Sequence, residues 1–339
     1  MRSPVAFPRG HHPSALAPTP AARRRTPVTP EAIPIVVDSD GGEVSCDALW
    51  FALNHPSLDV LAVTAGPGVV TAARAARNFA KVLAAAGRTD VPLAVGPEAR
   101  LGPAPPVPVP PAVADGDGLG GLHPGEAPMR PVAEPAPALL ARLCGHRPGE
   151  VVVAALGPFG NLARALRRRP ELAGSARGLV AMGGALAAAG NATPVAEYNV
   201  AYDPVAAREL VRAAWTSPPG LIGLDVTARA TLGRRELELL RARRTPAARF
   251  LAGPIERYAR VAAGPDGTFP THDVLVPMAI AEPDLVAWTT VGLDVDVAGG
   301  AEWGRTRTGD VAAGWPRWRV AVDVDVDRFR AGVRRLYGG

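Results

Sequence analysis

The chain has 339 residues, of which 47% are hydrophobic, and a formal net charge of +5 at pH 7. This length allows one large domain or two small ones, and the apolar content is sufficient for a core. No apolar run reaches the ~20 residues of a membrane-spanning helix, and the N-terminus lacks the continuous apolar stretch of a secretory signal. The two cysteines, Cys46 and Cys144, are too few for a disulfide framework. We therefore expect a cytoplasmic protein without a membrane partner.

The basic residues do not form a nucleic-acid-binding pattern. Nearly all are arginines in short clusters, such as 167–169 and 243–244, with no aromatic residues interleaved. No DNA- or RNA-binding motif accompanies them. Solvated helix faces explain these clusters, so we expect no nucleic-acid partner.

Strands and helices alternate through most of the chain. Residues 1–31, rich in Pro, Ala and Arg without periodicity, are predicted to be a disordered tail. The predicted strands cover residues 33–37, 58–64, 91–95, 150–156, 178–182, 220–224, 291–297 and 319–324. The main predicted helices cover residues 48–54, 71–86, 139–145, 161–168, 204–214, 234–241, 247–262 and 326–337. This alternation predicts an α/β fold, an open, mainly parallel sheet with helices on both faces, in a single domain over residues 32–337.

One long segment, residues 100–137, interrupts the alternation. It carries six prolines between residues 103 and 111, followed by a glycine-rich stretch at 116–121. Loops of this length inside a compact domain are usually functional or disordered. A lid over a site and a surface excursion without a role are both compatible with this composition.

Acids and amides recur where the predicted strands end. In a parallel sheet the carboxyl ends of the strands share one edge, where ligands bind. Asp40, Asp47 and Asp273 would supply three hard oxygen donors there, which suit Ca²⁺ or Mg²⁺. A bound cation acidifies water, a carboxylate can take its proton, and His272 would be an acid near neutral pH. Each of these residues alone could have an ordinary structural role, such as helix N-cap for Asp47. Their common position at one edge of the predicted sheet indicates a site.

The sequence resembles a known enzyme family through an ordered array of motifs. These are VDSD…CDALWFAL, VTAGPGVV, GRTDVPLAVG, DGLGG, ALGPFGNLARAL, AMGGAL, GNATPVAEYNVAYDP, GLDVT and THD. Together, from residue 33 to residue 329, they resemble the nucleoside hydrolases of the inosine–uridine-preferring type. The resemblance implies a Rossmann-like nucleoside hydrolase fold and cleavage of nucleosides to ribose and free base with Ca²⁺. It also implies a role in purine or pyrimidine salvage and a homo-oligomer, either a dimer or a tetramer.

The same resemblance implies roles for individual residues. Asp40 would bind Ca²⁺ and act as general base, and His272 would protonate the departing base. The other implied metal ligands are Asp47, Asp273 and the backbone carbonyl of Gly160. The implied substrate-binding residues are Asn191, Glu197, Asn199 and Met182 around the sugar and Tyr258 against the base.

The acidic turn departs from the pattern of that family. Asp40 and Asp47 are seven residues apart, two more than the family's spacing, and Cys46 replaces a ribose-binding aspartate. Val69 stands where the family usually has asparagine. Two hypotheses therefore stay open. The chain is either a Ca²⁺-dependent hydrolase with altered substrate preference, or a weakly active or inactive relative that binds a nucleoside-like ligand or serves as a subunit.

Overall fold

The computed structural model describes residues 32–102, 107–113, 116–123 and 129–338. The predicted disordered tail, residues 1–31, and parts of the 100–137 segment lie outside these ranges. Within the described ranges, no helix has the length and apolar character needed to cross a membrane.

The structure confirms an open, mainly parallel sheet. Within the described residues, nine strands pair in the order β10-β9-β11-β6-β5-β4-β1-β2-β3, and of these pairs only β9–β11 and β9–β10 are antiparallel. The strands are β1 (Ile33–Ser39), β2 (Leu58–Ala65), β3 (Leu93–Val95), β4 (Val152–Ala155), β5 (Gly178–Met182), β6 (Gly220–Ile222), β9 (Val286–Val295), β10 (Thr306–Gly309) and β11 (Arg317–Val324); β7 (Thr231–Leu232) and β8 (Phe269–Pro270) form a separate pair. The continuous apolar run of β1 is buried on both faces, as expected for a central parallel strand.

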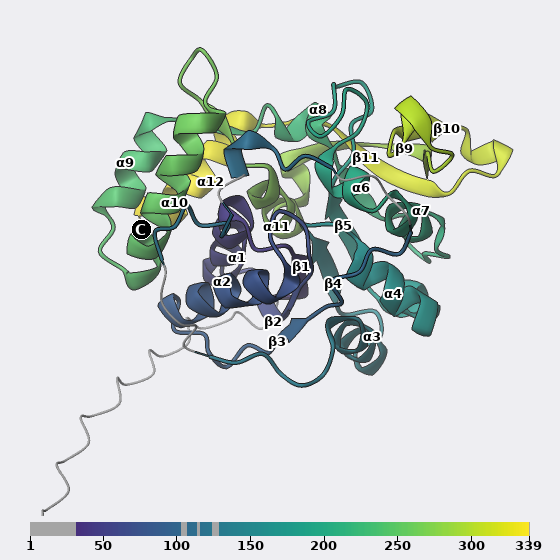
Figure 1. The fold of residues 1–339 in the computed structure, drawn as a ribbon, viewed down its shortest axis with the longest axis horizontal. Coiled ribbons are helices and arrows are strands. Elements are labelled where there is room, and N and C mark those ends of the chain that lie inside the picture. The colour runs from purple at the N-terminus through teal and green to yellow at the C-terminus, as the bar shows by residue number, and fades with distance from the viewer. Residues whose placement is uncertain (1–31, 103–106, 114–115, 124–128, 339) are drawn as a thin grey trace, which may run out of the picture.

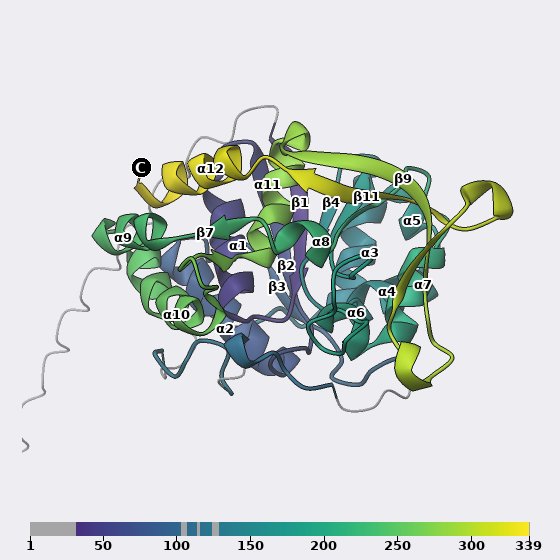
Figure 2. The same cartoon turned by 90° about the horizontal axis from the view of Figure 1, so that it is seen from above.

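Helices cover both faces of this sheet. The helices are α1 (Glu43–Asn54), α2 (Ala72–Ala85), α3 (Ala136–His146), α4 (Gly160–Arg168), α5 (Leu172–Ser175), α6 (Tyr198–Tyr202), α7 (Pro204–Arg212), α8 (Leu224–Thr227), α9 (Arg234–Ala242), α10 (Pro246–Ala262), α11 (Leu275–Ala281) and α12 (Val326–Gly338). Figures 1 and 2 show α1, α2, α10 and α12 on one side of β1 and α3, α4 and α7 on the other. Each helical layer packs its own cluster of buried residues against the sheet.

The strand order reverses direction between β1 and β4. From β1 the chain builds outward through β2 to β3, and then returns to place β4, β5 and β6 on the other side of β1. Ligands in open α/β sheets bind beyond the carboxyl ends of the strands at such a reversal. Asp38 and Ser39, the last two residues of β1, and Asp40 directly after them are buried and stand at this position.

The C-terminal part of the sheet differs from the prediction. The strand predicted over residues 291–297 is β9, which begins at Val286, ends at Val295 and contains buried, half-buried and exposed residues without regular alternation. The sequence gives no signal for β10, whose residues TRTG include no large apolar side chain. It is held by antiparallel pairing to β9 rather than by burial of a hydrophobic face.

Candidate functional site

A cavity of about 200 Å³ opens at the reversal of strand order. The described residues that line it are Asp40, Gly42, Val44, Ser45, Val69, Pro110, Val113, Leu156, Met182, Asn191, Glu197, Tyr198, Asn199, Tyr258, Ala262, Pro270, His272 and Asp273. They come from the ends of β1, β4 and β5, from α1, α6 and α10, and from the loops between. Three of these residues carry carboxylates and none is lysine or arginine, so the described wall has only acidic formal charges.

Asp40 is held closely by the backbone around it. Its Oδ2 accepts a hydrogen bond of 2.9 Å from the Val69 amide, and the residue is 4% exposed. A Cβ at Gly68 would stand 2.1 Å from Asp40 Oδ2, and one at Gly157 would stand 2.8 Å from the Asp40 amide nitrogen. Gly68 therefore lets the loop after β2 approach the carboxylate of Asp40, and Gly157 lets the loop after β4 approach its backbone.

Ser45 bridges the two aspartates of the cavity. Its hydroxyl lies 3.2 Å from Oδ1 of Asp40 and 2.7 Å from Oδ2 of Asp273. Asp273 arrives from a 3₁₀ turn, His272–Val274, more than two hundred residues later in the chain. The structure thus brings together Asp40 and Asp273, as the sequence predicts, and adds Ser45 between them.

Burial dominates the ionisation of this pair. It raises the pKa of Asp40 above its ordinary value, against hydrogen bonds from Val69 and Ser45 that lower it. Burial also raises the pKa of Asp273 well above its ordinary value, and the negative charge of Asp40 adds to this rise. Two buried carboxylates that destabilise each other's charge favour either a shared proton or a bound cation.

Asp47 lies apart from the cavity. The helix predicted over residues 48–54 is α1, which begins at Glu43, so Asp47 belongs to its second turn and not to the acidic loop. Residues two apart in a helix point about 200° apart around its axis. Ser45 faces Asp40, whereas the carboxylate of Asp47 accepts a 2.6 Å hydrogen bond from the Tyr337 hydroxyl of α12.

The prediction of Gly160 as a metal ligand also needs correction. Gly160 is the first residue of α4 and is not among the described residues lining the cavity. Leu156, at the end of β4, lines it instead and accepts a 3.1 Å hydrogen bond from the Asn199 side chain through its carbonyl. The sequence could not indicate Leu156, because it contributes its backbone carbonyl and any residue type has one.

The predicted sugar-binding residues gather on one wall. Glu197 precedes α6, and its carboxylate accepts hydrogen bonds from the amides of Gly184, Asn199 and Val200, at 2.9–3.2 Å. The Asn199 side chain donates to the Met182 carbonyl at 3.2 Å. Asn191 is exposed, and its side-chain oxygen accepts from the Tyr198 amide at 2.8 Å. Burial raises the pKa of Glu197 to about 7.

His272 and Tyr258 line the same cavity, from the 3₁₀ turn His272–Val274 and from α10. Nδ1 of His272 lies 2.8 Å from the Thr227 hydroxyl of α8, and burial lowers the imidazole pKa to about 4. The ring is therefore neutral at pH 7. Tyr258 of α10 is buried, lines the cavity and contacts Phe269 edge to face.

Asp225 holds the loop that carries part of the sugar wall. Its carboxylate accepts backbone hydrogen bonds from Leu186, Ala187 and Ala188, at 2.7–2.9 Å. Burial raises the pKa of Asp225, but these donors outweigh burial and the net pKa is lowered. The first turn of α8 thus fixes the start of the segment between β5 and α6.

Asp225→Ala is expected to raise KM for the substrate about tenfold, with a smaller change in kcat. Hydrogen bonds to a charged group are each worth ~1.5–3 kcal/mol, and about 1.4 kcal/mol of lost binding corresponds to tenfold. Steady-state kinetics of the variant measure this effect. Asp323→Ala removes an exposed, salt-bridged carboxylate and serves as the control. An unchanged KM in Asp225→Ala would show that the loop does not need this anchor.

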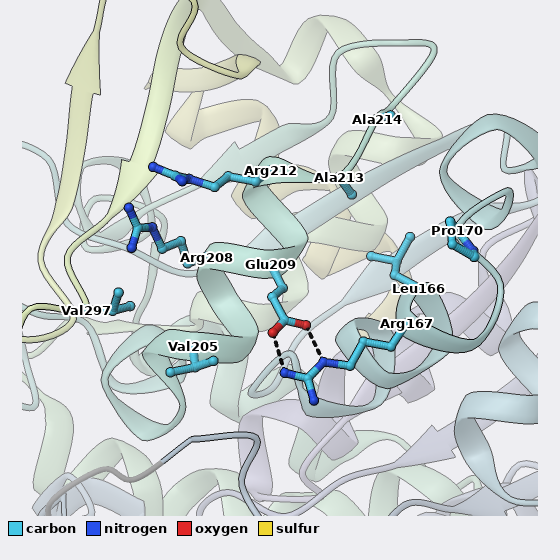
Figure 3. A pocket seen from close by; sticks show the side chains of 10 residues that line it. All are labelled: Leu166, Arg167, Pro170, Val205, Arg208, Glu209, Arg212, Ala213, Ala214 and Val297. Carbon is cyan, nitrogen blue, oxygen red and sulfur yellow. Dashed lines mark hydrogen bonds and ion pairs between the residues drawn. The ribbon is translucent and has the colours of Figure 1, made fainter.

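A wider groove of about 490 Å³ lies elsewhere, between α4 and α7 (Figure 3). Its arginines are already paired. Arg167 forms two hydrogen bonds with Glu209, and Arg208 and Arg212 both contact Asp294. The groove has no acid–amide constellation and does not lie at the strand reversal. We therefore assign the chemistry to the smaller cavity.

Comparisons with known proteins match most of the chain to one family. The family model described as inosine-uridine preferring nucleoside hydrolase matches residues 35–331. A pyrimidine-specific ribonucleoside hydrolase of Photobacterium profundum is 31% identical over 281 residues, which are 80% of this chain and 87% of that relative. Two solved structures, a plant nucleoside hydrolase and a purine-preferring ribonucleoside hydrolase from Gardnerella vaginalis, each have a TM-score of 0.84 at 27% identity. They cover 91% and 90% of this chain and 99% and 98% of their own.

Proposed function

Because the chain belongs to the inosine–uridine preferring nucleoside hydrolase family, we propose that it cleaves the N-glycosidic bond of nucleosides with water and depends on calcium. The observation that carries this proposal is the Asp40–Asp273 pair. The pair shares one cavity with the sugar wall of Glu197 and Asn199 and with His272.

The donor set of the cavity is compatible with a calcium ion. Asp40 and Asp273 are each 4% exposed, and the described lining offers them no lysine or arginine. Calcium takes six to eight oxygen ligands, including carboxylates, backbone carbonyls and water. Asp40 and Asp273 would hold the ion. When bound, it would keep both carboxylates ionised and make a nearby water more acidic.

The residues around Asp40 and Asp273 would each have a different role in hydrolysis. Asp40 takes the proton of the attacking water, since it lines the cavity at the strand reversal. Glu197, Asn199 and Asn191 hold the sugar, with Met182 beneath it. The transition state for glycoside cleavage resembles an oxocarbenium ion, so the acidic wall stabilises the positive charge that develops on the sugar.

His272 and Tyr258 would act on the leaving base. A neutral imidazole donates a hydrogen bond but has no spare proton, and the pKa of His272 is near 4 in the protein alone. Negative charge that develops on the departing base would raise this pKa, because an opposite charge nearby favours the imidazolium. His272 would then take up a proton from solvent water as the glycosidic bond breaks and pass it to the departing base, while Tyr258 packs against the base.

The substrate preference would differ from that of relatives with a polar acidic turn. Val44 and Val69 flank Asp40, and Val69 stands where the family usually has asparagine. Two apolar side chains cannot hydrogen-bond a sugar hydroxyl, and a buried hydroxyl without a partner loses ~1–3 kcal/mol. We therefore propose that the protein discriminates weakly between ribonucleosides and 2′-deoxyribonucleosides.

A nucleoside panel tests the function and the preference together. Purified protein with calcium is incubated with uridine, cytidine, inosine, adenosine and their 2′-deoxy forms, and free base is measured by chromatography. We expect base release, with kcat/KM for the better deoxyribonucleoside within about tenfold of its ribonucleoside, a difference of about 1.4 kcal/mol. A much larger preference for ribose would contradict the proposed role of the valines.

The alternative of a weakly active nucleoside-binding protein draws on the position of Asp47 outside the cavity. It predicts saturable nucleoside binding by calorimetry without release of base, and that result would replace the hydrolytic proposal. The expected dimer or tetramer and the cytoplasmic location stay predictions; light scattering coupled to size exclusion tests the first.

A further inference from the structure

We propose that Ser45, and not Asp47, supplies the third side-chain oxygen of the cation site between Asp40 and Asp273. Asp47 is instead a structural carboxylate that connects α1 to α12. The inference rests on the calcium site of the proposed function and concerns which residues of this chain build that site.

The position of Ser45 carries the first half of the inference. Its hydroxyl is 1% exposed and contacts one oxygen of each aspartate, at 3.2 and 2.7 Å. A hydroxyl has one proton and two lone pairs, so it cannot donate fully to both carboxylates at once. Its oxygen is a neutral, hard donor between two anionic ones. A cation at this point would relieve the repulsion between the carboxylates and use the hydroxyl oxygen as a ligand.

The surroundings of Asp47 carry the second half. Its Oδ2 accepts the Tyr337 hydroxyl at 2.6 Å, and the Tyr337 ring stacks on Trp50 one turn further along α1. Asp47 and Tyr337 are each 1% exposed. For Asp47 to reach the cavity, α1 would have to rotate by about half a turn and expel Ser45, since the two side chains lie about 200° apart on the helix. That rotation would disrupt the packing of α1, in which every residue from Ser45 to Leu53 is buried.

The start of α1 explains why the longer spacing does not loop out. Gly41 has a φ of 73° and its Cα lies against Ala75, where a Cβ would stand 2.5 Å from the Ala75 Cα. Gly42 then forms the N-cap. The helix therefore begins two residues after Gly41, and the extra residues lengthen α1 at its N-terminus instead of forming a bulge. Ser45 arrives where a shorter turn would have brought an aspartate.

The proposed ligands determine how tightly the site would bind calcium. Two carboxylates and a hydroxyl place two negative charges around the ion, whereas a third aspartate would place three. Calcium affinity in proteins is tuned by the number of charged ligands. The site of this chain is therefore expected to bind calcium more weakly than the same site with aspartate at position 45.

Calcium calorimetry on the chelator-stripped full-length protein tests the inference with three variants. Ser45→Ala removes the hydroxyl, Ser45→Asp adds a charge, and Asp47→Asn removes the other carboxylate while keeping an acceptor for Tyr337. We expect Kd for calcium to rise about tenfold or more in Ser45→Ala, to fall about tenfold in Ser45→Asp, and to stay within about twofold in Asp47→Asn. Thermal unfolding without calcium reports whether each variant is folded.

The possible outcomes distinguish a wrong assignment of Ser45 from a wrong proposal of calcium-dependent hydrolysis. Weaker calcium binding in Asp47→Asn, together with wild-type binding in Ser45→Ala, would overturn the inference and leave a calcium-dependent hydrolase with Asp47 as ligand. Wild-type protein that binds no calcium would overturn both. Tyr337→Phe supplies an independent readout: we expect a lower unfolding temperature with unchanged calcium affinity, and a parallel loss of affinity would place Asp47 in the cation site.

Discussion

Asp40→Asn is expected to lower kcat/KM for nucleoside hydrolysis by about 10²–10⁴-fold, the usual contribution of a general base. The amide cannot accept the proton of the attacking water and carries no charge for a cation. The fold should persist because the asparagine oxygen can still accept the Val69 amide, and the side chain has the same shape in its crowded position beside Gly68.

The exposed Asp327 of α12 provides a matched control for this substitution. Asp327→Asn removes a carboxylate of the same kind away from the cavity and should leave kcat/KM unchanged. Far-ultraviolet circular dichroism and the unfolding temperature verify that both variants are folded. Full activity in a folded Asp40→Asn protein would sink the proposed mechanism, because no other carboxylate of the cavity occupies the same place at the end of β1.

Removal of calcium is expected to abolish most of the activity and to lower the unfolding temperature. Burial raises the pKa of both Asp40 and Asp273, and the negative charge of Asp40 raises the pKa of Asp273 further. Without a cation, the folded protein therefore either takes up protons at these carboxylates or becomes less stable. A ligand present at 100 times its Kd stabilises the folded state by about 2.7 kcal/mol. For a domain of this size, that corresponds to roughly 5 °C in the unfolding temperature.

The measurement is a paired one, of initial rate and thermal unfolding after treatment with a calcium-selective chelator. Activity and unfolding temperature should both return when calcium is added in excess, and magnesium should restore them less completely because it requires stricter octahedral geometry. A chelated protein that keeps its rate and its unfolding temperature would exclude calcium from the mechanism, although the family assignment would stand.

The fold could be predicted from the sequence because its signals are local. The β-branched run of β1, the short turns after the strands and the helical periodicity of α2 and α10 each indicate their own element. Their alternation then limits the topology to a parallel sheet covered on both faces. The polar edge strand β10 lacks such a local signal, since only its hydrogen bonds to β9 define it.

The candidate site could be predicted only in part, because its details depend on the register of one helix. Asp40, Glu197, Asn199, His272 and Asp273 line a common cavity, and each was identifiable by residue type at the end of a strand or in a loop. Because α1 begins at Glu43 and not at Ala48, Ser45 faces the cavity and Asp47 faces α12. Nothing in residues 43–47 marks that boundary, which follows from the approach of Gly41 to Ala75.

The burial of Glu43 could not be predicted from the sequence either. An acid within an inserted stretch would ordinarily be exposed, yet Glu43 is fully buried and forms a 2.7 Å ion pair with Arg257 of α10. This pair connects the first turn of α1 to the helix that carries Tyr258. The partner is 214 residues away in the chain, so no local pattern could have indicated it.

Equal release of free base and reducing sugar in phosphate-free buffer tests the central claim most directly. Hydrolysis requires only water and yields free pentose, which a reducing-sugar assay detects, whereas transfer to phosphate would yield a sugar phosphate that this assay does not detect. We expect calcium-loaded protein to release base and reducing sugar in a one-to-one ratio from at least one nucleoside of the panel. Base release that requires added phosphate, or nucleoside binding without either product, would contradict it.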